Sequence, residues 1–438
     1  MIVTMGVLGL RLAAGAVPSD FWPTESCRSC HPDIVDQHLR SHHERSAADP
    51  VFQAQYFKEL LPRVEAEPAL RAEARACTAC HEPIVHVTGG GLLTRPEQAD
   101  AGRSGVTCDV CHVMVGHAPP EPGNGNYLLQ PGAKKYGPFA DVGDWHHAHS
   151  RFHARSEMCA TCHQATNRLG LEVKSTFTEW KRSRFAASGV QCQDCHMTTD
   201  GFLTAGRPRY ASGTAAQMAA FEAPRRERLF THRFPGAHSR SQVTGAVSLS
   251  VVAPQRVASP GERLGIRVAV DNGRTGHSMP TGSGDLRQLW LEVTAGAGAG
   301  AVALPPESRW VPGSEPARRE AACQPSVDPP SREEVPPGSQ VYRAVFGDAE
   351  GKPTLASYRA ASLLCDTRLR AGETRVENYA YDVPPEATGA ITVRAVLRYL
   401  AYPGAFALAL GLPSAEAVDV AAAALEVPIE GTGDARRP

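Results

Sequence analysis

Five short cysteine–histidine motifs carry the chemistry that this sequence offers. They read CRSCH, CTACH, CDVCH, CATCH and CQDCH, and they begin at residues 27, 77, 108, 159 and 192. Cys-x-x-Cys-His is the attachment sequence for c-type haem. In such a motif the two thiols add across the vinyl groups of the porphyrin, and the adjoining imidazole binds the iron. The spacing therefore predicts five covalently bound c-type haems.

Each motif supplies two attachment cysteines and one proximal iron ligand. The predicted attachment residues are Cys27, Cys30, Cys77, Cys80, Cys108, Cys111, Cys159, Cys162, Cys192 and Cys195. The predicted proximal ligands are His31, His81, His112, His163 and His196. No catalytic residue is predicted.

A Cys-x-x-Cys pair alone also fits half of a zinc site or a redox dithiol. Ten of the twelve cysteines fall in the five pairs, and a histidine follows every pair. Neither a zinc site nor a dithiol needs a histidine at that position each time. The repeated histidine therefore favours haem over both alternatives.

The sixth ligand of each iron decides what a haem can do. A second imidazole gives a haem that only passes electrons, whereas an open position can bind and reduce a small molecule. The chain has 17 histidines, so twelve remain outside the motifs. Five of these could complete every haem.

The motifs need a scaffold, and residues 20–240 are expected to supply it as helices and loops. Pro32 favours a helix that starts directly after the first motif. Two further helices are predicted within 51–80 and a last one over 213–230. The segment 119–144 is rich in glycine and proline and is expected to be a loop.

From about residue 244 apolar residues alternate with small or polar ones. The alternation is clearest in five segments: 247–251, 264–270, 289–293, 379–383 and 391–399. Short alternating strands separated by turn residues are typical of an antiparallel sandwich. We therefore expect an α+β multidomain protein. A helix-and-loop haem domain at 20–240 precedes a β-sandwich domain at 244–430, and 431–438 form a disordered tail.

The N-terminal residues 1–16 are interpreted as a signal segment. They contain an apolar stretch and an A-x-A site at Ala14-Gly15-Ala16, although Arg11 interrupts the stretch. An ordinary buried N-terminus is the alternative. Covalent haem attachment takes place outside the bacterial cytoplasmic membrane, so we expect a periplasmic or extracellular protein. No run reaches the roughly 18 apolar residues of a membrane span.

The net charge, the two cysteines outside the motifs and one lysine pair allow further expectations. The formal charge of −1 argues against nucleic acid as a partner. In an oxidising compartment Cys323 and Cys365 could form a disulfide, and two separate buried thiols are the alternative. Lys134 and Lys135 are expected to be solvated or to neutralise haem propionates.

Several stretches between and beyond the motifs share a family pattern. They are SHHERSA at 41–47, GVTCDVCH at 105–112, GPF at 137–139, TFTEW with GVQCQDCHM, THRFPGAH at 231–238, GHSMPTG at 276–282 and DTRLRAGETR at 366–375. With them the chain resembles multihaem cytochromes c of the hydroxylamine oxidoreductase and pentahaem nitrite reductase superfamily. It is most similar to a subgroup in which a β-domain follows the haem domain.

The resemblance implies which histidines complete the irons from the distal side. The implied candidates are His43 with its neighbour His42, one of His146, His147 and His149, and the segment histidines His232, His238 and His277. The chain departs from the family at residue 38, where many members have tryptophan. The resemblance does not say which candidate belongs to which haem.

Three functions remain open, and an electron carrier is favoured. Little protein separates successive motifs, which suits electron transfer among mostly bis-histidine haems in anaerobic or respiratory transport. Its partners would be redox proteins such as a quinol dehydrogenase, a reductase or other cytochromes. The first alternative is an enzyme that acts on a nitrogen or sulfur oxo-compound at one five-coordinate haem. The second is an oligomer or haem filament.

Overall fold

The computed structural model describes most of the chain. The described residues are 15–96, 102–141, 147–218, 223–298, 300–307, 323 and 335–431. By compactness the chain divides into two units. Unit 1 comprises Met1–Gln164, Gln191–Gly201 and Pro208–Phe234, and unit 2 comprises Ala165–Val190, Phe202–Arg207 and Pro235–Pro438. The segment 165–190, which the sequence analysis assigns to the haem domain, thus groups with the later strands.

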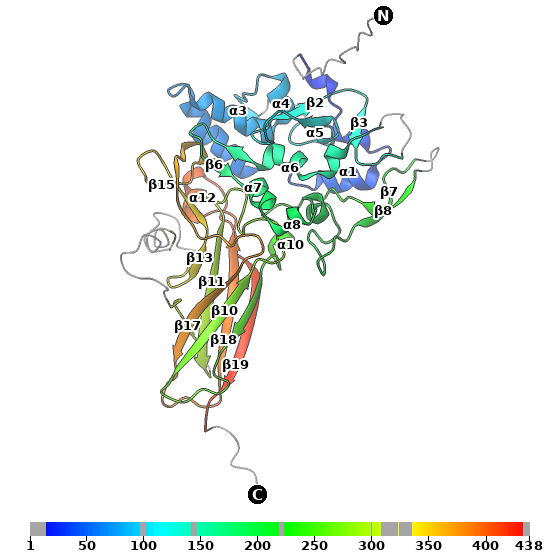
Figure 1. Cartoon of the computed structure of the whole chain (residues 1–438). Helices are drawn as coiled ribbons and strands as arrows, with labels where there is room; N and C mark the ends of the chain where they lie inside the picture. The colour runs from blue at the N-terminus through cyan, green and yellow to red at the C-terminus, as the bar shows by residue number, and fades with distance from the viewer. Residues whose placement is uncertain are drawn as a thin grey trace, which may run out of the picture. The chain divides into compact units, whose positions relative to one another are not determined.

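Short helices form most of unit 1 (Figure 1). Their bounds are η1 Pro18–Asp20, η2 Thr24–Cys27, α1 Pro32–Leu39, α2 Pro50–Gln53, the π-helical η3 Ala54–Leu60, η4 Leu61–Arg63, α3 Leu70–His81, α4 Pro83–Thr88, α5 Cys108–His112, η6 Arg151–Ala154, α6 Ser156–His163 and α9 Gln193–His196. The predicted helix after Pro32 and the helices within 51–80 are confirmed.

Prolines and polar caps explain where these helices begin. Proline occupies the first position of α1, α2 and α4, where its missing N–H costs no hydrogen bond. Asp49 caps α2 by accepting a 3.0 Å hydrogen bond from the Phe52 N–H. None of the described helices is both long enough and apolar enough to span a membrane.

Three pairs of short strands complete unit 1. β1 (Met114–His117) pairs with β2 (Tyr127–Leu129), β3 (Lys135–Gly137) with β4 (His147–His149), and β7 (Ala211–Thr214) with β8 (Arg225–Leu229). β2 and β3 lie in the segment predicted as loop. The predicted helix over 213–230 is wrong, because β7 and β8 occupy its described ends. Pro224 stands inside that segment and disfavours helix in the residue before it.

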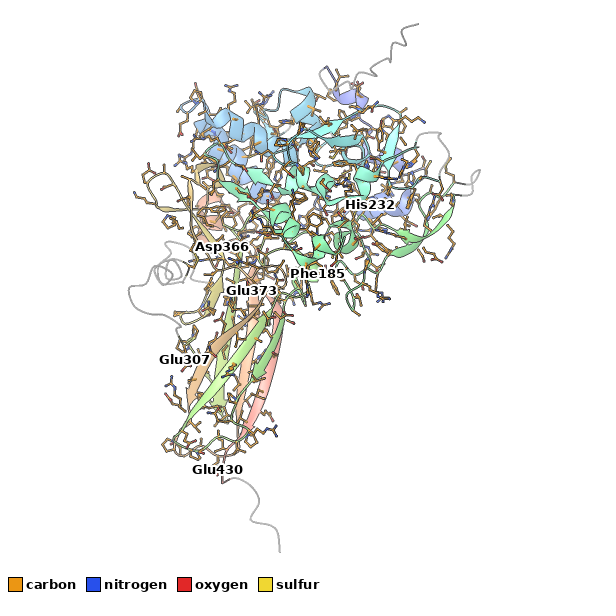
Figure 2. All side chains as sticks on the ribbon, in the orientation of Figure 1. Phe185, His232, Glu307, Asp366, Glu373 and Glu430 are labelled. Atoms are coloured by element: carbon orange, nitrogen blue, oxygen red, sulfur yellow. A yellow bond between two sulfur atoms is a disulfide. The ribbon has the colours of Figure 1, made fainter. Side chains whose placement is uncertain are left out.

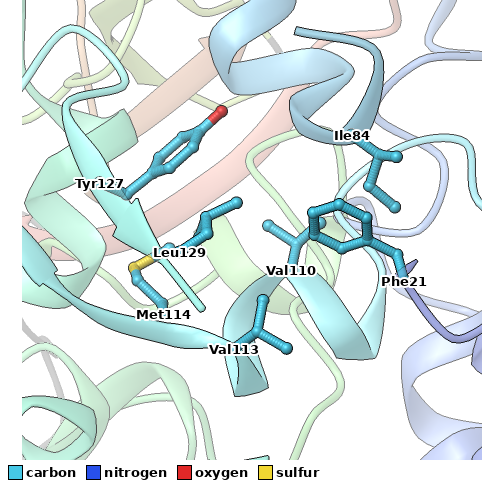
Figure 3. Close-up of a cluster of buried hydrophobic side chains, with 7 residues drawn as sticks. All are labelled: Phe21, Ile84, Val110, Val113, Met114, Tyr127 and Leu129. Atoms are coloured by element: carbon cyan, nitrogen blue, oxygen red, sulfur yellow. The ribbon is translucent and has the colours of Figure 1, made fainter. Parts of the chain in front are cut away.

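A buried apolar cluster packs against the third motif in unit 1 (Figure 3). Its members are Phe21, Ile84, Val110, Val113, Met114, Tyr127 and Leu129. Val110 lies between the two cysteines of CDVCH and is 1% exposed. The motif helix therefore turns one side to the apolar cluster and keeps its cysteines and histidine on another.

Unit 2 is built mainly from antiparallel strands. A three-stranded sheet contains β9 Ser248–Val252, β10 Arg263–Asp271 and β17 Thr374–Asp382. A five-stranded sheet contains β11 Gln288–Ala297, β12 Val302–Ala303, β13 Gln340–Tyr342, β18 Ala390–Leu400 and β19 Val418–Pro428. The smaller elements are β5 Ala165–Thr166, β6 Glu172–Lys174, α7 Thr176–Lys181, α8 Arg184–Ala187, α10 Arg240–Val243, β14 Ala344–Gly347, β15 Pro353–Thr354, η8 Ser357–Arg359, β16 Ser362–Asp366 and α12 Gly404–Leu410.

Alternation of apolar residues accounts for the two larger sheets. In β10 every second residue from Leu264 to Val270 is buried, and in β18 the same holds from Ile391 to Tyr399. Each sheet thus buries one face, as sheets that pack face to face do. The strands predicted from the five alternating segments are confirmed. The chain is a protein of mixed helix and sheet.

The predictions for the two ends of the chain fall mostly outside the described residues. Residues 1–14 of the proposed signal segment and residues 432–438 of the proposed tail lie outside the described residues.

A disulfide joins Cys323 to Cys365 of β16 in unit 2. The Cα atoms of the two cysteines are 6.0 Å apart, and 42 residues separate them in the sequence. Both side chains are buried, and Val345 and Leu364 pack against them. The bond therefore closes a long loop within the unit.

Replacing both cysteines by serine is expected to destabilise the protein by about 2–4 kcal/mol, because the loop is no longer closed in the unfolded chain. Unfolding by denaturant, with and without a thiol reductant, measures this loss. The reductant should destabilise the wild type and leave the double variant unchanged. Equal stability of oxidised wild type and double variant would contradict the expectation.

Candidate haem-binding sites

Every Cys-x-x-Cys-His motif forms one turn of helix in unit 1. Motifs two, three and four lie in α3, α5 and α6, and the fifth consists of α9 and its N-cap residue Cys192. In the first motif the His31 N–H donates to the Cys27 carbonyl at 2.9 Å, as in an α-helix. Residues i, i+3 and i+4 of a helix share one face. Both thiols and the imidazole of each motif therefore point to the same side.

Backbone carbonyls orient three of the proximal imidazoles. The Nδ1 atoms of His31, His81 and His112 lie 2.6, 2.9 and 2.7 Å from carbonyl oxygens. These carbonyls belong to Ala215, Ser46 and Tyr136 respectively. An imidazole that donates its Nδ1–H in this way keeps the Nε2 lone pair for a metal. The residues present thus fit the demands of covalently attached haem.

The five motif turns lie next to one another inside unit 1. The thiols of Cys27 and Cys108 are hydrogen bonded, which brings motifs one and three together. The thiols of Cys159 and Cys192 join motifs four and five in the same way. The Cys80 thiol hydrogen bonds with that of Cys162 and so joins motifs two and four. These contacts give two groups, motifs one and three and motifs two, four and five. Cys162 of the fourth motif packs on the apolar cluster that contains Val110 of the third, and this contact joins the two groups.

His43 is the distal candidate with the clearest surroundings. Its ring centroid lies 6.1 Å from that of His163 and 4.4 Å from that of Phe234. Burial, assisted by the neighbouring His163, lowers the pKa of His43 to about 3, so the ring is neutral at physiological pH. A neutral imidazole is the form that binds a metal.

The backbone around His43 is held under strain. Phe234 has a φ of 33°, which is unusual for an aromatic residue. Its carbonyl accepts a 3.1 Å hydrogen bond from the His42 N–H, and its ring packs on His43. SHHERSA and THRFPGAH, which are far apart in sequence, therefore meet at this point.

His232 lies in unit 1 (Figure 2), and its ring lies near that of His112 in the third motif. Its ring centroid is 6.2 Å from that of His112. The backbone N–H of His232 donates a 2.9 Å hydrogen bond to the Gln37 side-chain oxygen. Burial, assisted by the neighbouring His112, lowers the pKa of His232 to about 3. His153 is also 5.8 Å from His112, but its Nε2 lies 3.0 Å from the Cys111 carbonyl. His153 therefore sits against the motif turn itself.

The remaining distal candidates have other surroundings. The Nε2 of His147 lies 2.6 Å from the Phe139 carbonyl, and His146 lies outside the described residues. In unit 2 the ring of His238 is 6.1 Å from that of Tyr402, and the Nδ1 of His277 is 3.0 Å from the Ser278 carbonyl.

A single carboxylate in unit 2 connects three of the family-like stretches. Glu179, from TFTEW, accepts hydrogen bonds from the Ser278 N–H at 3.0 Å and the Thr281 hydroxyl at 2.7 Å. The Arg368 guanidinium donates to it at 2.7 Å. Burial raises the pKa of Glu179, but Arg368 and the hydroxyl donors outweigh it, so the pKa is lowered overall. Glu179 thus positions the loop that carries His277.

Sequence reasoning missed the carbonyls that orient the proximal histidines and the role of Glu179. Every residue has a carbonyl, so no residue type marks Ala215, Ser46 or Tyr136. Glu179 lies in a quoted stretch, but its partners are about 100 and 190 residues away. Only the folded chain brings them together.

The comparisons with known proteins agree with this geometry. Residues 26–113, which hold the first three motifs, match the family model for cytochrome c554 and c-prime. The chain is similar to a penta-heme cytochrome c552 from Thermochromatium tepidum at 21% identity and a TM-score of 0.62. That likeness covers 93% of this chain and 99% of that chain, and it shows a shared fold.

A second structural likeness is weak. The CARDB domain of the PF1109 protein from Pyrococcus furiosus is 9% identical, with a TM-score of 0.17 over 42% of this chain and 86% of that chain. No curated protein matches the chain. The five motifs, the family model and the shared fold together support a multihaem c-type cytochrome. They also support a haem-based electron-transfer function.

Arg368→Ala is expected to destabilise the protein by about 3–5 kcal/mol, because it leaves the Glu179 carboxylate, whose side chain is only 11% exposed, without its cation. The pKa of Glu179 is lowered in the folded state, so the ion pair stabilises the protein above the ordinary carboxyl pKa of 4.5. This stabilisation is lost as the pH falls through the lowered value. Denaturant unfolding at pH 7 and at pH values below 4.5 measures both effects.

Arg370→Ala is the matched control, since this arginine lies in the same loop with an exposed side chain. It should cost little at either pH. An equal loss in both variants would show that the loop, rather than the ion pair, determines the result.

Proposed function

We propose that this protein carries five covalent c-type haems and transfers electrons among them as an exported carrier. The proposal also places it in the hydroxylamine oxidoreductase and pentahaem nitrite reductase superfamily. One observation carries it: five helical turns, each with two thiols and an imidazole on one face, lie next to one another in unit 1. Redox proteins of respiratory transport would be its partners.

The chain's own residues would hold the haems and orient the imidazoles. Haem, when bound, supplies reversible one-electron chemistry at iron. The motif cysteines would hold the porphyrin as thioethers. The carbonyls of Ala215, Ser46 and Tyr136 would keep the proton on Nδ1 of His31, His81 and His112 and leave Nε2 of these three to hold iron.

Two pairs of imidazoles are proposed as joint iron ligands from the distances between their rings. Each pair would hold one haem iron between its two rings. His43 and His163 are separated by 6.1 Å, and His232 and His112 by 6.2 Å. We therefore assign His43 to the fourth motif and His232 to the third.

His153 is the rival for the third motif. The Cys111 carbonyl, which belongs to the same turn as His112, holds its Nε2. This contact engages the Nε2 of His153, so that nitrogen would not be open to iron, which favours His232. His42 stays the alternative to His43, and His146, His147, His238 and His277 stay proposals for the other irons.

The haem count and the iron spin states test the proposed function. The mature protein should give a pyridine haemochrome and an intact mass that correspond to five haems. Electron paramagnetic resonance of the oxidised protein should show low-spin iron that nitrite and hydroxylamine leave unchanged. A high-spin signal that responds to either compound would instead favour the enzyme. A colourless protein, or one with zinc at the thiols, would refute the proposal.

His43→Ala is expected to convert one of the five haems from low-spin to high-spin iron, because the fourth motif loses its distal imidazole. The resonance spectrum measures the change, and haem content should stay constant. His42→Ala is the matched control and should leave every iron low-spin. If His42→Ala alone produces the high-spin signal, the neighbour is the ligand and the assignment of His43 is wrong.

A further inference from the structure

A buried ion pair lies within the third motif. Asp109 stands between Cys108 and Cys111 and is 1% exposed, and its carboxylate pairs with the Lys135 ammonium. Lys135 is 9% exposed, although the adjoining Lys134 is exposed. Of the two roles expected for these lysines, solvation is wrong for Lys135, and neutralisation of haem propionates stays a prediction. The position of Lys135 in β3 turns it to the interior, because successive strand residues point to opposite sides.

Backbone groups and one aromatic ring enclose this ion pair. The Trp22 N–H donates to Oδ2 of Asp109 at 2.9 Å, and the Trp22 ring lies 4.3 Å from the Lys135 ammonium. The Gly132 carbonyl accepts a further hydrogen bond from that ammonium at 2.7 Å. Oδ1 of Asp109 meets the ammonium as an ion pair and has no other hydrogen-bond partner among the described residues. Both charges are buried and therefore poorly screened by water.

The ion pair lies where the first and third motifs meet. Asp109 adjoins Cys108, and its partner Trp22 lies five residues before Cys27. Lys135 adjoins Tyr136, whose carbonyl lies 2.7 Å from the Nδ1 of His112. The two charges therefore lie next to residues of the third motif and near the start of the first.

We propose that Asp109 and Lys135 set the reduction potentials of the haems held by the first and third motifs. This inference rests on the proposed function. Oxidation adds one positive charge at iron, so a nearby carboxylate favours the oxidised form and a nearby ammonium the reduced form. Burial makes both influences larger than those of surface charges.

A purely structural role explains this ion pair less well. Well-packed apolar residues of similar volume often stabilise a protein as much as a buried ion pair does. The charges cost desolvation free energy, and their position inside a haem motif gives them a use that apolar residues cannot serve. The two roles differ in what they predict for charge removal: a structural role gives loss of stability only.

Spectropotentiometric titration of the full mature protein tests the inference. Asp109→Asn should raise the potentials of one or two of the five reduction steps, because the ammonium is then unopposed. Lys135→Met should lower the potentials of the same steps. Lys135→Arg keeps the charge and should restore values close to wild type. Lys135→Met leaves the motif intact, so it tests the inference even if Asp109→Asn fails to mature.

Asp36→Asn is the matched control for a solvent-exposed charge. Asp36 pairs at 2.6 Å with Arg28, which lies inside the first motif, and their side chains are 50% and 38% exposed. Solvent screens this pair, so its shift should be smaller than either shift above. Shifts of the same sign in Asp109→Asn and Lys135→Met, or shifts no larger than the control, would overturn the inference. If the mature wild-type protein contains no haem, the proposed function itself is wrong.

Discussion

Unit 1 depends on one geometric constraint: two thiols and an imidazole must face the same side at five places. One turn of helix meets this constraint locally, since residues i, i+3 and i+4 share a face. The motif turns can therefore stand in very short elements such as α5 and α9. This explains why unit 1 needs neither long helices nor a large sheet to position its functional residues.

The local turn does not determine how the imidazole ring is oriented, and here the fold contributes. The carbonyls that contact His31, His81 and His112 lie 184, 35 and 24 residues away in the sequence. The ring orientation of these three histidines thus depends on where another segment of the chain is placed by the fold. Ala215 directly follows β7 and belongs to no motif, yet its carbonyl orients the His31 ring.

Local patterns predicted much of the structure, and long-range contacts set the limit. The motif residues, the helix after Pro32 and the strands of unit 2 follow from spacing, a proline or alternation over a few residues. Spacing could not show which motifs lie side by side, because that depends on the whole chain. The contacts of the Cys27 thiol with Cys108 and of the Cys159 thiol with Cys192 are examples. Lys135 illustrates the same limit, because only its place in β3 distinguishes it from Lys134.

The path of the chain bears on how unit 2 should be understood. The sequence analysis treats the strands as a domain that follows the haem motifs. Compactness instead groups residues 165–190 with the strands, although these residues run between the fourth and fifth motifs. Glu179 explains this grouping, because its hydrogen bonds to Thr281 and Arg368 hold the segment within unit 2. Unit 2 is therefore not an appended module: the chain enters it after the fourth motif and returns to form the fifth.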